Sequence, residues 1–418
     1  MTGAGLMLGK LKAITSYLAI ALIAFIPFQT FLTEFLIQQG TPVGLTYYLM
    51  HWYEPIAVIL LVLWLLLPKS RNQIWREPAT YLIGLGMISA MYLSPDWQQG
   101  IQGFRLSLFA LVIYLLVRLS EIKLTDAIVK LYLWLAISIS GWGIVEQLLP
   151  HLYWSKWHIL SADSLFGFGN HAVMNIYQST SIFIGPNQLA GYLLPAVFIL
   201  LANPLHWPKL KRIITLGIVL IALMLTFSRS ALLGLIIGAI IYLWYFGKSR
   251  KHSFSLLSAI GIGGLIIAGV IFELNGTHWK ELFLHSASTT GHWQGLIDTF
   301  KTLRERLMQP VTLCLGGGIG TAGPLALKYD GIISESWYLQ LALELGLVGL
   351  GLWLFSVIGW LKQLYCRVSQ LISTRGLWVG LIAVSVMALF LHPWADNPAL
   401  AITLLALVGL TLNQKTLA

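Results

Sequence analysis

The sequence predicts an all-α protein, a polytopic bundle of about twelve transmembrane helices. Hydrophobic residues make up 57% of the 418-residue chain and charged residues only 10%, whereas soluble domains carry about 25% charged residues. The mean hydropathy is +0.78, and apolar runs approaching the roughly 20 residues of a membrane-spanning helix recur throughout. Lipid offers no hydrogen-bonding partners, and the runs lack the alternation of barrel strands, so helices are the expected spans.

The predicted spans are apolar segments separated mostly by short polar breaks. They cover residues 13–32, 53–68, 79–94, 101–118, 127–149, 184–202, 213–228, 231–247, 254–274, 336–360, 376–391 and 398–413. The segment 213–247 is too long for one crossing at about 1.5 Å per residue and suits two short ones. Residues 13–32 lack a small-residue cleavage site and are expected to be a retained first span. No repeat or low-complexity linker divides residues 1–418, which predicts a single membrane domain.

The distribution of basic residues predicts the orientation of the bundle. With both termini inside, 18 of the 26 Lys and Arg residues lie on predicted cytoplasmic segments, as the positive-inside rule requires. The net charge of +10 is then a topology signal, and no basic stripe with interleaved aromatics indicates nucleic-acid binding. Cys314 is predicted outside and Cys366 inside, so no disulfide is expected.

Two long loops are predicted on the outer face, at 150–183 and 275–335. The larger one is inserted between the ninth and tenth spans. Its stretch "WQGLIDTFKTLRERLMQP" predicts a helix ending before Pro310, with an apolar face of Leu296, Ile297, Phe300, Leu303 and Leu307. This helix is expected to lie at the outer membrane surface or to pack on the spans.

Arg229 stands at the tip of the predicted hairpin 213–247, in "LIALMLTFSRSALLGLIIGAIIYLW". Both ends of this hairpin carry cytoplasmic Lys and Arg, so Arg229 is expected at the outer membrane boundary. Its planar guanidinium suits an oxyanion or phosphate. The alternative is an arginine that only extends to lipid headgroups.

Glu335 and Ser336 lie where the large loop meets the tenth span, and Glu344 lies about two turns further on. A carboxylate beside Trp337 and Tyr338 suits a general base, although a carboxylate near a helix start is also stabilised by the helix dipole. Intramembrane acids such as Glu344 usually line a cavity or pair with a cation. Gly346, Gly349 and Gly351 predict a small face for close helix packing.

These segments resemble the O-antigen ligase and O-antigen polymerase superfamily. The run from Arg229 to Leu233 fits its arginine-x-x-x-leucine pattern. Glu335 and Ser336 precede Gly346 and Gly349 with the spacing of the ligase histidine motif, with Glu in place of His. "GPNQLAGYLLP" (Asn187) resembles the polar start of a middle span, and "TTGHWQGLIDTF" with "PVTLCLGGGIG" resembles the large-loop motif, with His292 where an arginine is common. The resemblance covers roughly residues 180–360.

The resemblance implies a GT-C-like, metal-independent, inverting glycosyltransferase of the bacterial cytoplasmic (inner) membrane. Such enzymes move a glycan from polyprenyl (undecaprenyl) diphosphate to a hydroxyl of a glycan or glycolipid during surface polysaccharide assembly. Arg229 is then the catalytic cation and Glu335 the base. The predicted substrate-binding residues are Arg105, Asn187, His292, Ser336 and Tyr338. His292 as an ordinary loop residue and Arg105 as an interfacial anchor are the alternatives.

Glutamate in place of the ligase histidine slightly favours a polymerase over a ligase that transfers glycan to lipid A core. "LGGGIGTAG" (315–323) lacks a preceding strand and a Walker lysine, so a flexible outer loop is expected in place of a phosphate nest. His278, His285 and His292 are spaced too widely for a typical zinc site. No metal and no cofactor are expected, and the partners are the two substrates and membrane lipids.

Two other functional classes fit the composition. A secondary transporter would use Glu344 and Arg105 on a mid-membrane path, but no inverted repeat is apparent. A non-catalytic flippase partner or scaffold would leave Arg229 and Glu335 without a shared purpose. The sequence does not identify the sugar, the repeat unit, the acceptor or the oligomeric state.

Overall fold

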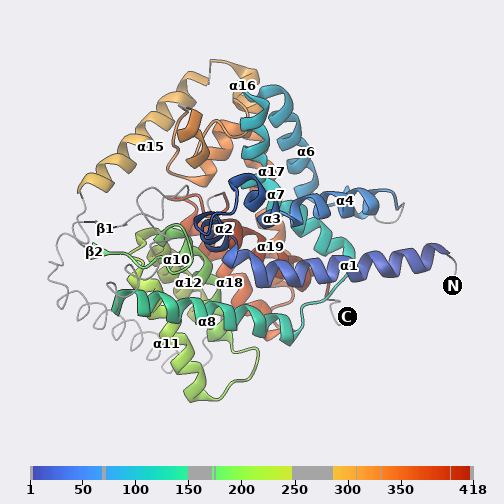
Figure 1. Cartoon of the computed structure of the whole chain (residues 1–418), viewed down its shortest axis with the longest axis vertical. Coiled ribbons are helices and arrows are strands. Elements are labelled where there is room, and N and C mark those ends of the chain that lie inside the picture. The colour runs from blue at the N-terminus through green and yellow to red at the C-terminus, as the bar shows by residue number, and fades with distance from the viewer. Residues whose placement is uncertain are drawn as a thin grey trace.

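The computed structural model describes residues 3–67, 72–148, 172–173, 176–246, 286–306, 308–329, 331–395 and 397–414. Helices dominate these parts of the chain (Figure 1). The first group is α1 (Gly3–Phe25), η1 (Ile26–Phe28), α2 (Gln29–Gln38), α3 (Val43–Met50), α4 (Tyr53–Leu65), α6 (Pro78–Ile88), the π-helical η2 (Ser89–Leu93), α7 (Trp97–Ser120) and α8 (Asp126–Leu148). A short antiparallel pair, β1 (Ala172–Val173) and β2 (Ile176–Tyr177), follows. The rest are α10 (Pro186–Ala202), α11 (Lys209–Leu225), α12 (Arg229–Phe246), α15 (Ser286–Arg306), α16 (Pro310–Leu315), η3 (Pro324–Tyr329), α17 (Trp337–Tyr365), α18 (Ile372–Met387) and α19 (Pro398–Leu412).

Helices cover eleven of the twelve predicted spans, and the remaining one, 254–274, lies outside the described residues. Five described helices are long and apolar enough to cross a membrane, and the bent pair α3 and α4 forms a sixth candidate. Four shorter apolar helices include α10, α18 and α19. The all-α bundle and its membrane character are confirmed at this level, while the count of twelve crossings stays a prediction.

Local sequence signals set several helix boundaries. Proline occupies the first turn of α6, α10, α16 and α19, where its missing N–H costs no hydrogen bond. The Asp96 side chain caps α7 by accepting from the Gln98 N–H at 3.1 Å, and Asn397 caps α19 by accepting from Leu400 at 3.0 Å. These caps satisfy backbone donors that a helix start leaves unpaired.

Helices α10, α12 and α18 pack closely because glycine and proline remove side-chain bulk between them. A Cβ on Gly376 would lie 2.5 Å from Ile199 Cα, and one on Gly234 would lie 2.5 Å from the Ala383 oxygen. Gly191 near the start of α10 faces Met387 at the end of α18. Tyr245 and Phe246 at the end of α12 contact Trp378. Both α10 and α12 therefore run antiparallel to α18.

Helix α17 is broken at Gly346, whose φ of 66° and ψ of −169° are not helical. A left-handed φ favours glycine because it has no Cβ. A Cβ on Gly346 would lie 2.2 Å from the Cys314 oxygen, whereas among the described residues no group other than its neighbours lies within 4 Å of a Cβ on Gly351. Gly346 thus forms a break that admits another segment and not part of a continuous packing face.

Candidate functional site

The candidate site lies at the end of the bundle where α18 finishes. Because α10 and α12 run antiparallel to α18, their first residues lie at this end. Asn187 is the second residue of α10 and Arg229 is the first residue of α12, and both are exposed. Two segments that are separate in the sequence thus present a polar and a cationic side chain at one end of the bundle.

The start of α17 joins the same end through backbone hydrogen bonds. The Trp337 N–H donates to the carbonyls of Ala388, at 3.1 Å, and Leu391, at 3.0 Å. The buried Ser336 hydroxyl donates to the Ala388 carbonyl at 3.3 Å. Glu335 precedes these anchors and is half-buried. The structure therefore brings Glu335 to the end of α18 near which α12 begins with Arg229.

Ser336 and Tyr338 have structural partners in this arrangement. The Tyr338 hydroxyl donates to the Ser385 carbonyl on α18 at 2.9 Å. Together with the Ser336 bond, this contact locks the first turn of α17 onto α18. Both residues thus hold Glu335 in place, and neither has been shown to contact a substrate.

The loop from Ala388 to Asn397, of which residue 396 lies outside the described residues, contacts both the Glu335 segment and the start of α10. The buried His392 Nε2 lies 3.2 Å from the Ser334 hydroxyl, one residue before Glu335. On the other side, the Asn397 amide donates to the Gln188 carbonyl at 2.6 Å. This loop therefore links the Glu335 segment to the start of α10. His392 was not predicted from the sequence, because an isolated histidine between two spans carries no spacing signal.

Glu146, in the last turn of α8, orders the chain beside Arg229. Its buried carboxylate accepts from the Ser181 N–H at 2.8 Å, the Thr180 N–H at 3.2 Å, and the hydroxyls of Thr180 and Ser179. The Ser179 N–H in turn donates to the Leu225 carbonyl at 3.0 Å, at the end of α11. A buried acid inside an apolar segment is a functional signal, and this rule would have identified Glu146 from the sequence.

Helix α15 passes directly over Glu335. A Cβ on Gly295 would lie 3.0 Å from Glu335 Cγ and 3.1 Å from its Oε1. Thr299 is fully buried, whereas Ile297 and Phe300 are 42% and 55% exposed. The predicted helix is confirmed, but its inner face is formed by Gly295 and Thr299 and part of its apolar face points outward. His292 lies one turn earlier in α15, and its side chain lies outside the described residues.

Arg105 lies in α7 and is bound by Glu54 of α4. Its Nε and Nη2 donate to the two carboxylate oxygens, each at 2.7 Å, and its guanidinium lies 5.0 Å from the centre of the Tyr47 ring. The bidentate ion pair with Glu54 therefore uses the two N–H groups of Arg105 that would otherwise bind a phosphate. The structure thus gives Arg105 a structural partner, and the prediction of a phosphate contact has no support in this geometry. Glu54 is another acid in an apolar segment that the same rule would have identified.

The glycine-rich segment 315–323 fills the break in α17. The Gly317 and Gly318 N–H groups donate to the carbonyls of Leu343, at 2.8 Å, and Glu344, at 3.1 Å. Arg306 also donates to the Leu343 carbonyl, and burial lowers its pKa. Ile319 and Ala322 are buried, so the expectation of a flexible outer loop is wrong for this segment. Its glycines allow the backbone to reach the open carbonyls of α17.

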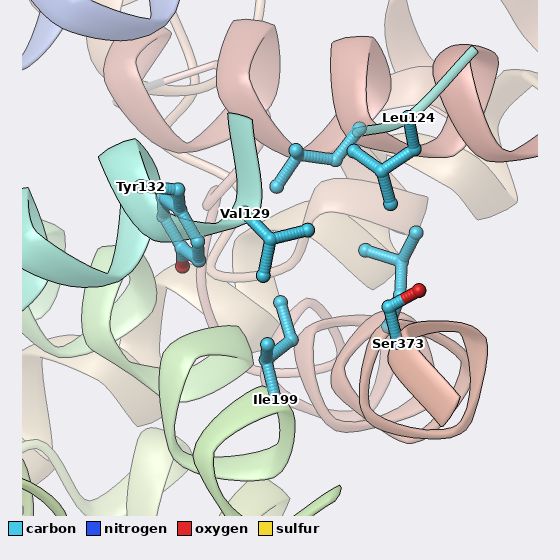
Figure 2. Close-up of a pocket in the computed structure, with 7 residues that line it drawn as sticks. Leu124, Val129, Tyr132, Ile199 and Ser373 are labelled. Atoms are coloured by element: carbon cyan, nitrogen blue, oxygen red, sulfur yellow. The ribbon is translucent and has the colours of Figure 1, made fainter. Parts of the chain in front are cut away.

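A small apolar pocket lies elsewhere, among α8, α10, α18 and α19 (Figure 2). Leu124, Val129 and Ile199 point into it, together with Tyr132 and Ser373. The Tyr132 hydroxyl is engaged by the Tyr192 carbonyl at 2.9 Å. Ser373 lies at the start of α18, so this apolar pocket is at the opposite end of that helix from the candidate site.

Comparison with protein-family models and with curated proteins finds no match for this chain. The resemblance described above therefore depends on the motifs quoted for it.

Proposed function

We propose that this protein is a metal-independent, inverting glycosyltransferase with a GT-C-like bundle of twelve membrane spans. It moves a glycan from a polyprenyl diphosphate to a hydroxyl of a glycan or glycolipid acceptor, outside the bacterial cytoplasmic membrane. Both termini are proposed to be cytoplasmic. Chain extension by a polymerase is favoured over transfer to lipid A core by a ligase, because Glu335 stands where the ligases carry histidine.

The observation that carries this proposal is the convergence of two segments about a hundred residues apart. Arg229 begins α12, and Glu335 precedes the anchor of α17 on Ala388, so both lie at the same end of α18. Helix α15 lies over Glu335 through Gly295. A cation at the start of α12 and a carboxylate in contact with α15 are the two groups that the reaction requires.

The chemistry assigns a different role to each group. Diphosphate is a good leaving group once its charge is held, and the Arg229 guanidinium offers paired donors for phosphate oxygens. Glu335 removes the proton of the acceptor hydroxyl as that oxygen attacks the anomeric carbon from the opposite face, which inverts the configuration. Asn187 is proposed to contact the donor substrate at the start of α10. The proposal requires no metal or other cofactor.

The decisive experiment is turnover by the purified protein in proteoliposomes. The donor is a polyprenyl diphosphate glycan, and the products are separated by size. Stepwise growth of the lipid-linked glycan would support a polymerase, and a single transfer to an added glycolipid would support a ligase. Release of no diphosphate lipid with either acceptor would contradict the proposal.

A secondary transporter is the second candidate, favoured by two interruptions in the described spans. Helices α3 and α4 are bent by 41° and α17 is broken at Gly346, and broken helices often form transporter sites. In α17, however, the glycine segment 315–323 occupies the break. Transport of the lipid-linked glycan or of a smaller solute across the vesicle membrane, without glycan transfer, would favour this candidate.

A further inference from the structure

Two polar side chains face each other inside α17, one helical turn apart. Gln340 is 2% exposed and Glu344 is fully buried. The Gln340 Nε2 donates to Glu344 Oε1 at 3.2 Å. The same Oε1 accepts the Ala322 N–H, from the glycine-rich segment 315–323, at 3.2 Å.

The other oxygen of each side chain is buried and forms no hydrogen bond among the described residues, although the Gly320 N–H also lies close to the Glu344 carboxylate. These atoms are Glu344 Oε2 and Gln340 Oε1. Both are acceptors if Glu344 is ionised, and each buried unpaired acceptor costs on the order of 1–3 kcal/mol. A proton on Glu344 Oε2 turns that atom into a donor toward Gln340 Oε1. One proton would thus let the two oxygens pair with each other, beside the hydrogen bond that the amide already donates to the acid.

We propose that Glu344 is held as a neutral carboxylic acid paired with Gln340, and that this pair is the latch that keeps segment 315–323 docked in α17. Arg306 is a cation close enough to act on Glu344. Its described hydrogen bond goes to the Leu343 carbonyl, and the described salt bridges do not include Glu344. We therefore assign the neutralisation of Glu344 to a proton and not to an ion pair.

The latch connects to Glu335 through three short steps. Glu344 binds the Ala322 N–H. The next residue, Gly323, donates its N–H to the Ile332 carbonyl at 3.0 Å, and Ala322 and Ile332 form a parallel bridge. Ile332 lies three residues before Glu335. Glu344 thus acts as a positioning residue for Glu335, and this role depends on the proposed function. The pairing of Glu344 with Gln340 does not depend on it.

The latch is tested with a cysteine at position 322, whose N–H binds Glu344. Ala322→Cys is made in a protein carrying Cys314→Ser and Cys366→Ser, and reaction of this buried thiol with a soluble maleimide is followed from neutral to alkaline pH. Glu344→Gln keeps the shape and both hydrogen bonds without needing a proton, since its amide donates to Gln340 Oε1. It should react as slowly as the parent at neutral pH, whereas Glu344→Ala should react at least about tenfold faster.

The labelling rates of the parent and of Glu344→Gln should diverge as the pH rises. Loss of the Glu344 proton opens the latch, so the labelling rate of the parent should increase toward that of Glu344→Ala. The labelling rate of Glu344→Gln should increase only because the thiol itself ionises, and this variant is the control for that effect. In the infrared spectrum, the parent should show a carboxylic acid carbonyl band that Glu344→Gln lacks.

An ionised Glu344 balanced by Arg306 would give the opposite results. Glu344→Gln would then expose the thiol as much as Glu344→Ala at neutral pH, and the carboxylic acid band would be missing. Either result would overturn the latch. If the labelling and infrared results are as expected but the protein transfers no glycan, the proposed function is contradicted and the latch still stands.

Discussion

Arg229 and Arg105 show how one residue type takes two roles in this protein. Arg105 is held by both oxygens of Glu54 and contributes to packing between α4 and α7. Arg229 is exposed at the first position of α12. A thermal unfolding curve for each Arg229 variant separates an effect on transfer from an effect on folding.

We expect Arg229→Lys to lose much of the transfer activity, because the ammonium keeps the charge but not the planar fork. Arg229→Ala should lose more, about 30-fold to 1000-fold in rate, corresponding to roughly 2–4 kcal/mol for a charge-assisted contact. Initial rates and donor binding by purified proteins give the measurement. Arg76→Ala, which removes another exposed arginine, is the control. Near-normal turnover by Arg229→Ala would mean that Arg229 only contacts lipid headgroups.

Glu335→Gln keeps the size of the side chain and removes its ability to accept a proton. Turnover should fall by about 100-fold or more, in the range of general-base contributions, while binding of the lipid-linked donor stays close to that of the parent. The pair of variants thus separates the roles, since Arg229 changes weaken donor binding. Retained activity of Glu335→His would show that either residue type serves as the base. Full activity of Glu335→Gln would identify Glu335 as a helix-start carboxylate only.

At the scale of elements, α15 contacts Glu335 and α17 is divided into two parts. The close approach of α15 depends on Gly295, because any Cβ there meets Glu335. The division of α17 depends on Gly346 and on the glycine segment that enters the break. Both features result from contacts between distant segments.

Gly295→Leu should displace α15 or the Glu335 side chain and reduce turnover by about tenfold or more, as small misplacements of catalytic groups do. Gly295→Ala should have a smaller effect, because the flexible Glu335 side chain needs to move only a few tenths of an ångström. Gly359→Ala is the matched control: among the described residues, no group beyond its own helix lies within 4 Å of its added Cβ. Transfer rates with thermal unfolding curves are the measurement. Equal activity of Gly295→Leu and the parent would show that α15 does not lie over a working Glu335.

At the scale of the whole molecule, α17 connects the candidate site to the other face. Gly346 contacts the Cys314 backbone, and Cys366 forms the C-cap of α17. The twenty residues between Gly346 and Cys366 rise about 30 Å as a helix, which matches the roughly 30 Å hydrocarbon core of a bilayer. The two cysteines therefore mark opposite ends of one proposed crossing.

Thiol labelling with a membrane-impermeant reagent tests the proposed orientation. Both cysteines are exposed, so a difference in labelling reports the side of the membrane and not burial. Cys314 should react in intact cells, and Cys366 should react only after the membrane is permeabilised. Single-cysteine variants, Cys314→Ser and Cys366→Ser, assign each signal. Labelling of Cys366 in intact cells would reverse the topology and place the candidate site in the cytoplasm.

The sequence by itself determined the membrane character, the approximate helix positions and the helix of the large loop. These depend on local properties: apolar run length, proline in first turns, and periodicity over a few turns. The sequence also indicated Arg229 and Glu335 as candidates by residue type and spacing. It also carried a signal for Glu146, an acid inside an apolar segment, but none for His392, whose partner Ser334 lies 58 residues away in the sequence.

Only the tertiary structure decided which ionisable groups pair and which lie near one another. Arg105 meets Glu54 across 51 positions of sequence, so no local pattern distinguishes it from Arg229. The break at Gly346 exists because the glycine segment satisfies the carbonyls that the helix leaves open, and a continuous helix would satisfy them equally well in isolation. The apolar pattern is a local property of the sequence. The pairing of ionisable groups depends on which segments the packing of α10, α12, α17 and α18 brings into contact.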